Sequence, residues 1–259
     1  MTSPKAMLID ITMCVGCNTC QDACKRQNKL SGDAETKLSA TAYTALEEHK
    51  GVTVRRMCQH CEKPTCASVC PVGALAKQPE GPVTYDESKC IGCRYCMQAC
   101  PFQVPRYEWS STYPRVQKCR FCYDRVKNGL QPACAEACPT GATKFGSRED
   151  LLKEAAARIQ AEPGKYVNRI YGQSEVGGTS ILYISSVPFE QLGFKTHLSS
   201  DPLPELTMNA LEKIPTVVTV GGVFLAGVYW ITSRREEVRR AEGSKPSRVR
   251  YPEPQKATS

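Results

Sequence analysis

Residues 90–101, with the sequence CIGCRYCMQACP, contain four cysteines at the spacing C-x2-C-x2-C-x3-C and a proline directly after the last one. Three cysteines on so short a loop can place their thiolates at three corners of one metal–sulfur cubane, while the fourth points away towards a second cluster. Pro101 cannot continue a helix, so the local helix is expected to end at Cys100. This arrangement is typical of the ligands of bacterial iron–sulfur clusters.

Three further groups of four cysteines occur in the chain, and the four groups together account for all 16 cysteines. An internal repeat of this kind says more about the architecture than any single motif does. The first group is followed by lysine instead of proline, so its helix is expected to run on through Arg26 and Gln27. The second and fourth groups have longer central gaps, C-x2-C-x4-C-x3-C and C-x2-C-x11-C-x3-C. The three groups are Cys14, Cys17, Cys20 and Cys24; Cys58, Cys61, Cys66 and Cys70; and Cys119, Cys122, Cys134 and Cys138.

Two other uses of closely spaced cysteines compete with this interpretation. A secreted disulfide framework requires neither this spacing nor the trailing prolines. Zinc sites use two pairs of cysteines for each ion, not a triplet with a remote fourth. Iron–sulfur ligation requires thiolates, so the clusters are expected to be assembled in a reducing compartment.

The grouping also predicts which cysteines share a cluster. Groups two and three are close in sequence and should form one two-cluster unit, so groups one and four must pair around it. If the fourth cysteine of each group ligates the cluster of the partner group, four [4Fe–4S] clusters are expected. Their predicted ligands are set I, Cys14, Cys17, Cys20 and Cys138; set II, Cys24, Cys119, Cys122 and Cys134; set III, Cys58, Cys61, Cys66 and Cys100; and set IV, Cys70, Cys90, Cys93 and Cys96.

The predicted fold class is α+β, with two nested ferredoxin-like two-cluster units and one C-terminal transmembrane helix. Strands are expected near residues 8–11, 52–57, 83–85 and 181–183, whereas residues 31–50 are polar and predict a surface excursion. The predicted domains are an outer unit, 1–57 and 113–150; an inserted unit, 58–112; an extension packing on the core and on a partner, 151–213; the transmembrane helix, 214–233; and a basic cytoplasmic tail, 234–259.

Residues 215–232, PTVVTVGGVFLAGVYWIT, form a stretch of 18 residues without a charge. As a helix it would span roughly 27 Å, close to the thickness of the bilayer core. Tyr229 and Trp230 stand at one end, where an aromatic belt would lie, and Gly222 and Ala226 suit close packing against another helix. The stretch predicts a single membrane span; the alternative is a buried helix of a soluble domain.

The residues after this stretch are basic. Between Ser233 and Ser259 there are eight Lys and Arg against four Glu, a net charge of +4. The positive-inside rule places such a tail in the cytoplasm and the cluster domain on the outer, periplasmic face of a bacterial membrane. The N-terminal residues do not resemble a secretory signal, so the folded chain is expected to cross with a partner that carries one.

The net charge of the whole chain, +8, does not require a nucleic-acid partner. Thiolate-ligated clusters are anionic, and lysines and arginines offset that charge. Basic residues near the cysteine loops are candidates for raising cluster potentials, with ordinary surface charge as the alternative; they are Lys25, Arg26, Arg94, Lys118 and Arg120. No nucleophile–base pair or nucleotide-binding glycine loop is present, so no catalytic residue is assigned. His60, beside Cys61, could hydrogen-bond near a cluster, but it is interpreted as an exposed or merely structural histidine.

Two stretches resemble a known family. Residues 118–142, KCRFCYDRVKNGLQPACAEACPTGA, are similar to the fourth cluster motif of the iron–sulfur subunits that accompany molybdopterin oxidoreductases. Residues 175–194, EVGGTSILYISSVPFEQLGF, followed by one membrane helix, resemble the beta subunit of membrane-bound formate dehydrogenase and, equally, the iron–sulfur subunit of a hydrogenase of the hydrogenase-2 type. In relatives of the nitrate reductase type one cysteine is replaced and a three-iron cluster results, whereas this chain has all sixteen.

The resemblance implies an electron-transfer subunit without catalysis of its own. One partner would be a catalytic subunit with molybdenum or tungsten pterin, or with nickel–iron in the hydrogenase alternative. The other would be an integral cytochrome b or quinone-reactive subunit in the bilayer. Two functions of other classes are a soluble polyferredoxin, which the apolar stretch disfavours, and a scaffold held by zinc, which would lack the colour of iron–sulfur clusters.

Overall fold

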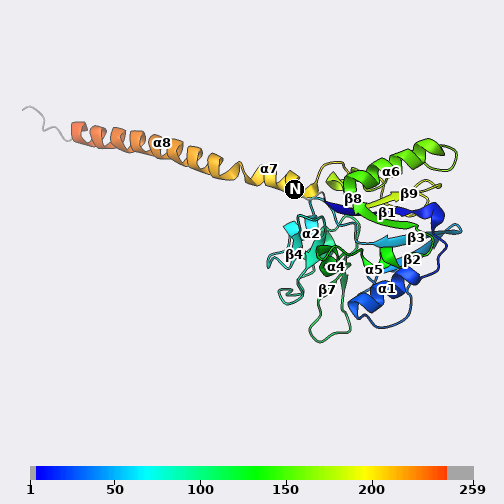
Figure 1. Ribbon diagram of the computed structural model, residues 1–259. Coiled ribbons are helices and arrows are strands. Elements are labelled where there is room, and N and C mark those ends of the chain that lie inside the picture. Colours follow the sequence, from blue (N-terminus) through cyan, green and yellow to red (C-terminus); the bar gives the residue numbers. More distant parts are fainter. Residues whose placement is uncertain (1–3, 244–259) are drawn as a thin grey trace, which may run out of the picture. The chain divides into compact units, whose positions relative to one another are not determined.

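The computed structural model describes residues 4–243 and divides the chain into two units, residues 1–207 and 208–259 (Figure 1). Three strands form the central sheet of the first unit: β1, Lys5–Asp10; β8, Thr143–Ser147; and β9, Ile181–Ile184. β1 lies in the middle, antiparallel to β8 and parallel to β9. The strand predicted at residues 8–11 is therefore present, shifted towards the N-terminus.

Alternation along β1 explains why this sheet is buried on both faces. Met7 and Ile9 pack in one hydrophobic core, and Ala6 and Leu8 pack in the other, because successive side chains of a strand point to opposite faces. Helix α6, Arg148–Ala161, covers the second face, as Figure 1 shows. The first face is covered by the cysteine-bearing loops, whose thiols contribute to the same core.

A hairpin of β2, Thr44–His49, and β3, Val52–Met57, packs beneath the cysteine loops. Lys50 and Gly51 connect the strands, both with positive φ (52° and 79°), the conformation that a tight two-residue hairpin requires. The prediction of a surface excursion over residues 31–50 was therefore wrong for residues 44–49, which form β2. Thr44 and Ala45 are buried. The polar residues around them did not predict a strand, but pairing with β3 stabilises one.

The remaining elements of the first unit are short and surround the cysteines. Two small hairpins, β4 with β5 and β6 with β7, accompany five helices and two 3₁₀ turns. Their bounds are β4, Leu75–Lys77; β5, Val83–Tyr85; β6, Arg106–Tyr107; β7, Val116–Gln117; α1, Thr19–Asn28; α2, Thr65–Ser68; α3, Tyr95–Ala99; α4, Tyr123–Lys127; α5, Ala133–Glu136; η1, Ile11–Met13; and η2, Glu175–Gly177.

The C-terminal segment consists of α7, Leu203–Leu211, and α8, Ile214–Gly243. Residues 203–243 contain a stretch long and apolar enough to cross a membrane, and none of that stretch is buried within the structure. The hydroxyls of Thr219 and Thr232 donate to carbonyls of their own helix, Pro215 O at 2.8 Å and Val228 O at 2.9 Å. Such internal bonds satisfy polar groups that lipid cannot. Most of the predicted basic tail, from residue 244, lies outside the described residues.

The mixed helix and strand content and the long apolar C-terminal helix agree with the predicted class. The nesting of two ferredoxin-like units within it, and the predicted domain boundaries, stay predictions.

Candidate metal centre

The first and third cysteine loops have the same local conformation. Gly16 and Gly92, each directly before the second cysteine of its group, have φ of +71° and +70°. A Cβ at Gly92 would lie 2.8 Å from the Pro114 carbonyl oxygen, so no larger residue fits without movement. In both loops a residue in the left-handed conformation, Asn18 or Arg94, is the N-cap of the helix that carries the third cysteine. The fourth cysteine lies within α1 in the first loop and at the C-cap of α3 in the third. α3 ends at Ala99 and α1 continues to Asn28, as the following proline or lysine predicts.

The second and fourth loops share a different conformation. The residue before the second cysteine is His60 in one and Phe121 in the other, with φ of 47° and 58°. Both side chains are fully buried. After each loop a short helix, α2 or α5, begins behind a proline at its N-cap, Pro64 or Pro132. The four loops therefore form two structural pairs, loop one with loop three and loop two with loop four.

The four cysteines of set I line one cavity, together with Arg55 and residues of β1 and β2. Cys14 and Cys17 come from the loop after η1, Cys20 from the start of α1, and Cys138 from the turn before β8. Cys17 is exposed, so this cavity lies near the surface. The Thr19 hydroxyl donates to the Cys17 sulfur at 3.3 Å.

The four cysteines of set IV line a second cavity, together with Tyr85 and Val116. Cys93 is exposed, as Cys17 is in the other cavity. The backbone N–H of Ala74 donates to the Cys70 sulfur at 3.2 Å. Burial opposes ionisation of Cys90, but nearby hydrogen-bond donors, including the backbone of Val116 and Gly92, hold the pKa of its thiol below the usual value.

The cysteines of sets II and III lie deeper. Burial and then the neighbouring thiols of Cys58, Cys100 and Cys66 raise the pKa of Cys61 well above its usual value. In the same way, burial and then the thiols of Cys24, Cys58, Cys134 and Cys122 raise the pKa of Cys119. The structure thus brings the members of each set close to one another. It also places Cys58 of set III near Cys119 of set II.

Two more thiol contacts join neighbouring sets. Cys134 of set II is close enough to Cys20 of set I to act on its pKa, and Cys96 of set IV acts on Cys66 of set III. These thiol pairs connect set I with set II, set II with set III and set III with set IV. Sets I and IV each include one exposed cysteine.

The arrangement fits iron–sulfur cubanes better than single metal ions. Among residues 4–243, no three His, Cys, Asp or Glu side chains converge closely enough to hold one ion, whereas one zinc ion needs four donors around it. Burial raises the pKa of Cys24 and Cys66 to about 12, so their thiolates require the positive charge of bound metal. Iron would be held by the thiolates of sets I to IV and would supply one-electron redox chemistry.

The basic residues singled out in the sequence occupy very different positions. Lys118 is 2% exposed, and its ammonium donates to the carbonyl oxygens of Val83 at 2.6 Å and Cys119 at 2.9 Å. Lys25 is buried and paired with Glu35 at 3.1 Å. The other three lie nearer to solvent: Arg26, exposed; Arg94, over the Tyr107 and Trp109 rings; and Arg120, paired with Glu87.

His60 is structural, as its sequence context indicates, but it is not exposed. Its Nδ1 accepts the backbone N–H of Val83 at 3.0 Å, and its exposed fraction is 0%. Burial, followed by the charges of Lys118 and Lys77, lowers the pKa of the ring well below its usual value. The imidazole is therefore neutral and holds the Cys58 loop against β5.

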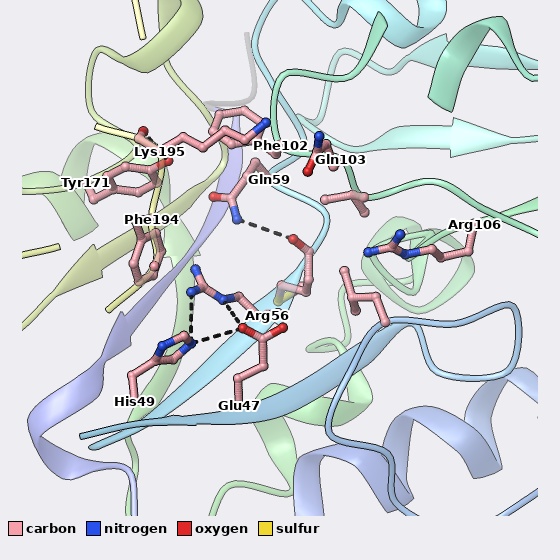
Figure 2. A pocket seen from close by; sticks show the side chains of 14 residues that line it. Glu47, His49, Arg56, Gln59, Phe102, Gln103, Arg106, Tyr171, Phe194 and Lys195 are labelled. Atoms are coloured by element: carbon pink, nitrogen blue, oxygen red, sulfur yellow. Dashed lines mark hydrogen bonds and ion pairs between the residues drawn. The ribbon is translucent and has the colours of Figure 1, made fainter. Parts of the chain in front are cut away.

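Sequence reasoning missed Arg55, which is 2% exposed and lines the set I cavity. The only feature of the sequence that could have indicated its role is its place in a short strand directly before a cysteine group. Side chains alternate along a strand, so one of the adjacent Arg55 and Arg56 must point towards the cysteines. The adjacent Arg56 points to the opposite side, into a pocket lined by Glu47, His49 and Tyr171 but by no cysteine (Figure 2).

Comparison with known proteins agrees with these features. Residues 49–148 match the family described as 4Fe-4S dicluster domain. The chain is 36% identical over 233 residues to the hydrogenase-2 operon protein HybA of Escherichia coli O157:H7, covering 72% of this chain and 71% of the relative. It is 33% identical over 247 residues to the formate dehydrogenase iron-sulfur subunit of Haemophilus influenzae, covering 86% and 78%.

A protein of Nitratidesulfovibrio vulgaris is 40% identical over 254 residues, which is 91% of this chain and 69% of that protein. These matches extend well beyond the cysteine loops into the C-terminal half. Three observations lead to the same assignment. They are the sequence stretches that resemble the family, the clustering of the thiols, and the large share of both chains that each comparison covers. The chain belongs to the family of iron–sulfur electron-transfer subunits that includes those of formate dehydrogenases and HybA of the hydrogenase-2 operon.

Proposed function

We propose that this chain binds four [4Fe–4S] clusters, one in each of sets I to IV, and passes electrons along them between a catalytic subunit and a membrane subunit. The observation that carries this proposal is the mutual proximity of the four thiols within each set. It supports the crossed assignment, in which Cys100 joins set III and Cys138 joins set I.

The proposed architecture is one ferredoxin-like unit nested in another. Supporting it, each predicted unit combines one loop of the Gly16 and Gly92 type with one loop of the His60 and Phe121 type. Set I and set II would belong to the outer unit, and set III and set IV to the inserted unit. Helix contacts agree, because α1 packs against α5 and α2 packs against α3.

The order of the sets defines the proposed path. Reduced clusters pass electrons to their neighbours, so a linear order I, II, III, IV makes sets I and IV the two ends. Cys17 and Cys93, one in each terminal set, are exposed, while every cysteine of sets II and III is buried or partly buried. The ends would therefore face the partners, and sets II and III would relay charge between them.

The partners are proposed from the relatives. A formate dehydrogenase subunit and a hydrogenase-2 operon protein both cover most of this chain at similar identity. The catalytic partner is therefore a molybdenum or tungsten formate dehydrogenase subunit, with a nickel–iron hydrogenase subunit as the second candidate. An integral cytochrome b or quinone-reactive subunit would complete the path at the membrane.

The apolar helix α8 is proposed as a single membrane span with the cluster unit outside and the C-terminus in the cytoplasm. Arg234, Arg235, Arg239 and Arg240 follow the apolar stretch, and positive charge favours the cytoplasmic side. A reporter fused after Ser259 should be active only in its cytoplasmic form. A tail accessible to external protease in intact cells would reverse this orientation.

The decisive experiment is purification of the intact complex from membranes through a tag on this chain. We expect about 16 iron atoms for each copy of the chain, from four cubanes of four iron atoms, and reducible EPR signals at low temperature. Molybdenum or tungsten in the same preparation would identify the first candidate partner, and nickel the second. A colourless chain, or one that holds zinc, would refute the proposed function.

A further inference from the structure

Arg55 is a buried cation with no carboxylate partner among residues 4–243. Its Nε donates to the Thr44 hydroxyl at 2.9 Å and its Nη1 to the Thr143 hydroxyl at 3.0 Å. Its Nη2 is buried and has no hydrogen-bond partner among residues 4–243. An uncompensated buried charge is strongly destabilising, so the guanidinium must be balanced by an anionic group that approaches the free Nη2.

The location of Arg55 identifies that group. The side chain lines the cavity of set I with Cys14, Cys17, Cys20 and Cys138. The thiols that act most strongly on the guanidinium are those of Cys134, which belongs to set II, and of Cys20, which belongs to set I. One guanidinium therefore stands between the two sets.

We propose that Arg55 is a shared counter-charge for the clusters of sets I and II, which raises the reduction potentials of both. This inference rests on the proposed ligand sets. Reduction adds one electron to a cluster that is already anionic, and a fixed positive charge nearby stabilises the reduced form. The hydroxyls of Thr44 and Thr143 hold the guanidinium, and with it the charge, in position.

The proposal also distinguishes the two halves of the relay. Arg55 acts on thiols of sets I and II, whereas the charge that acts on Cys66 of set III is Lys118 and that on Cys90 of set IV is Arg115. Loss of Arg55 should therefore change the potentials of sets I and II and leave those of set IV unchanged. A general loss of stability would not produce this selectivity.

The test is an EPR-monitored redox titration of the intact membrane complex carrying Arg55→Gln, with iron measured in the same sample. We expect full iron content and a lower potential for two clusters, with the reduction equilibrium changed at least tenfold, which is 59 mV for a one-electron couple. The two signals are those lost in Cys17→Ala and Cys122→Ala. In Arg55→Lys, which keeps the charge, both potentials should return most of the way to their wild-type values.

Arg56→Gln is the matched control, because it removes the same charge from the next position of β3. Its guanidinium lies on the other side of the hairpin, with Nε donating to Glu47 at 2.9 Å and Nη2 close to His49 (Figure 2). All four potentials should stay at their wild-type values. An equal shift in Arg55→Gln and Arg56→Gln would show a remote charge effect and refute the proposal.

A second measurement covers the case in which Arg55→Gln does not assemble. In the wild-type complex labelled with ¹⁵N-arginine, pulsed EPR should detect nitrogen coupling to a reduced cluster, and Arg55→Lys should abolish it. Absence of this coupling at full iron content would overturn the proposal for Arg55. The proposed function would fail separately, through missing iron or missing EPR signals in the wild-type protein.

Discussion

The rings of His60 and Phe121 meet edge to face, with their centroids 4.8 Å apart and their planes at 61°. Each residue stands directly before the second cysteine of its group, and each has a positive φ. The second and fourth loops thus contact each other through equivalent positions. The contact therefore joins the residue before Cys61 of set III to the residue before Cys122 of set II.

Replacing Phe121 with alanine should weaken this junction. Removal of a fully buried phenylalanine leaves a cavity and typically destabilises a protein by about 3–5 kcal/mol. We expect the visible cluster absorbance to disappear at a clearly lower temperature than in the wild type. Tyr113→Ala, at a side chain that is 83% exposed, is the control and should change little. Equal melting temperatures for the two variants would contradict a structural role for the ring contact.

The crossed assignment of the fourth cysteines predicts how paired substitutions combine. Cys100→Ala and Cys58→Ala should affect the same cluster, so the double variant should lose no more EPR signals than either single variant. Cys100→Ala with Cys90→Ala should affect two clusters. The measurement is iron content together with EPR spin integration. If Cys100→Ala instead combined without added loss with Cys90→Ala, set III and set IV would have to be redrawn.

Gly92→Ala should impair loading of the third loop. The backbone at Gly92 has φ of +70°, and a Cβ there would lie 2.8 Å from the Pro114 carbonyl oxygen. The left-handed conformation alone costs an alanine about 1–2 kcal/mol, and the contact adds to this. Gly129→Ala is the matched control, because φ is +77° but no atom lies within 4 Å of the added Cβ. Iron content should fall more in Gly92→Ala than in Gly129→Ala. A similar fall in both variants would show that the left-handed conformation alone, and not the contact with Pro114, causes the loss of iron.

A charge in the middle of α8 should prevent stable membrane insertion. Leu225→Arg places a guanidinium near the centre of the apolar stretch, which costs about 2.5–3.5 kcal/mol or more in insertion free energy. We expect the variant chain to move from the membrane fraction to the soluble fraction. Val238→Arg, among the charged residues after the stretch, is the control and should stay with the membrane. Retention of Leu225→Arg in an unaltered complex would indicate that partner subunits, not lipid, cover this helix.

Much of the candidate site could be predicted from the sequence, because the spacing of cysteines acts over short distances. The end of α3 before Pro101 and the extension of α1 past Lys25 follow from local backbone rules. β2 could not be found in this way. Four of its six residues are polar, and it is a strand only because β3 pairs with it; the Tyr183 hydroxyl of the central sheet donates to the Arg55 carbonyl of that hairpin.

What the sequence determined by itself was the chemistry: sixteen thiols in four groups, the short helices that carry them and one apolar stretch of membrane length. The tertiary structure brought together thiols that the spacing could only pair by rule. It also buried Arg55 and Lys118 where no carboxylate among residues 4–243 pairs with them. The physical reason is the distance along the chain over which each feature is determined. Ligand spacing and helix ends depend on neighbours along the chain, whereas the burial of a charge depends on segments that meet only after folding.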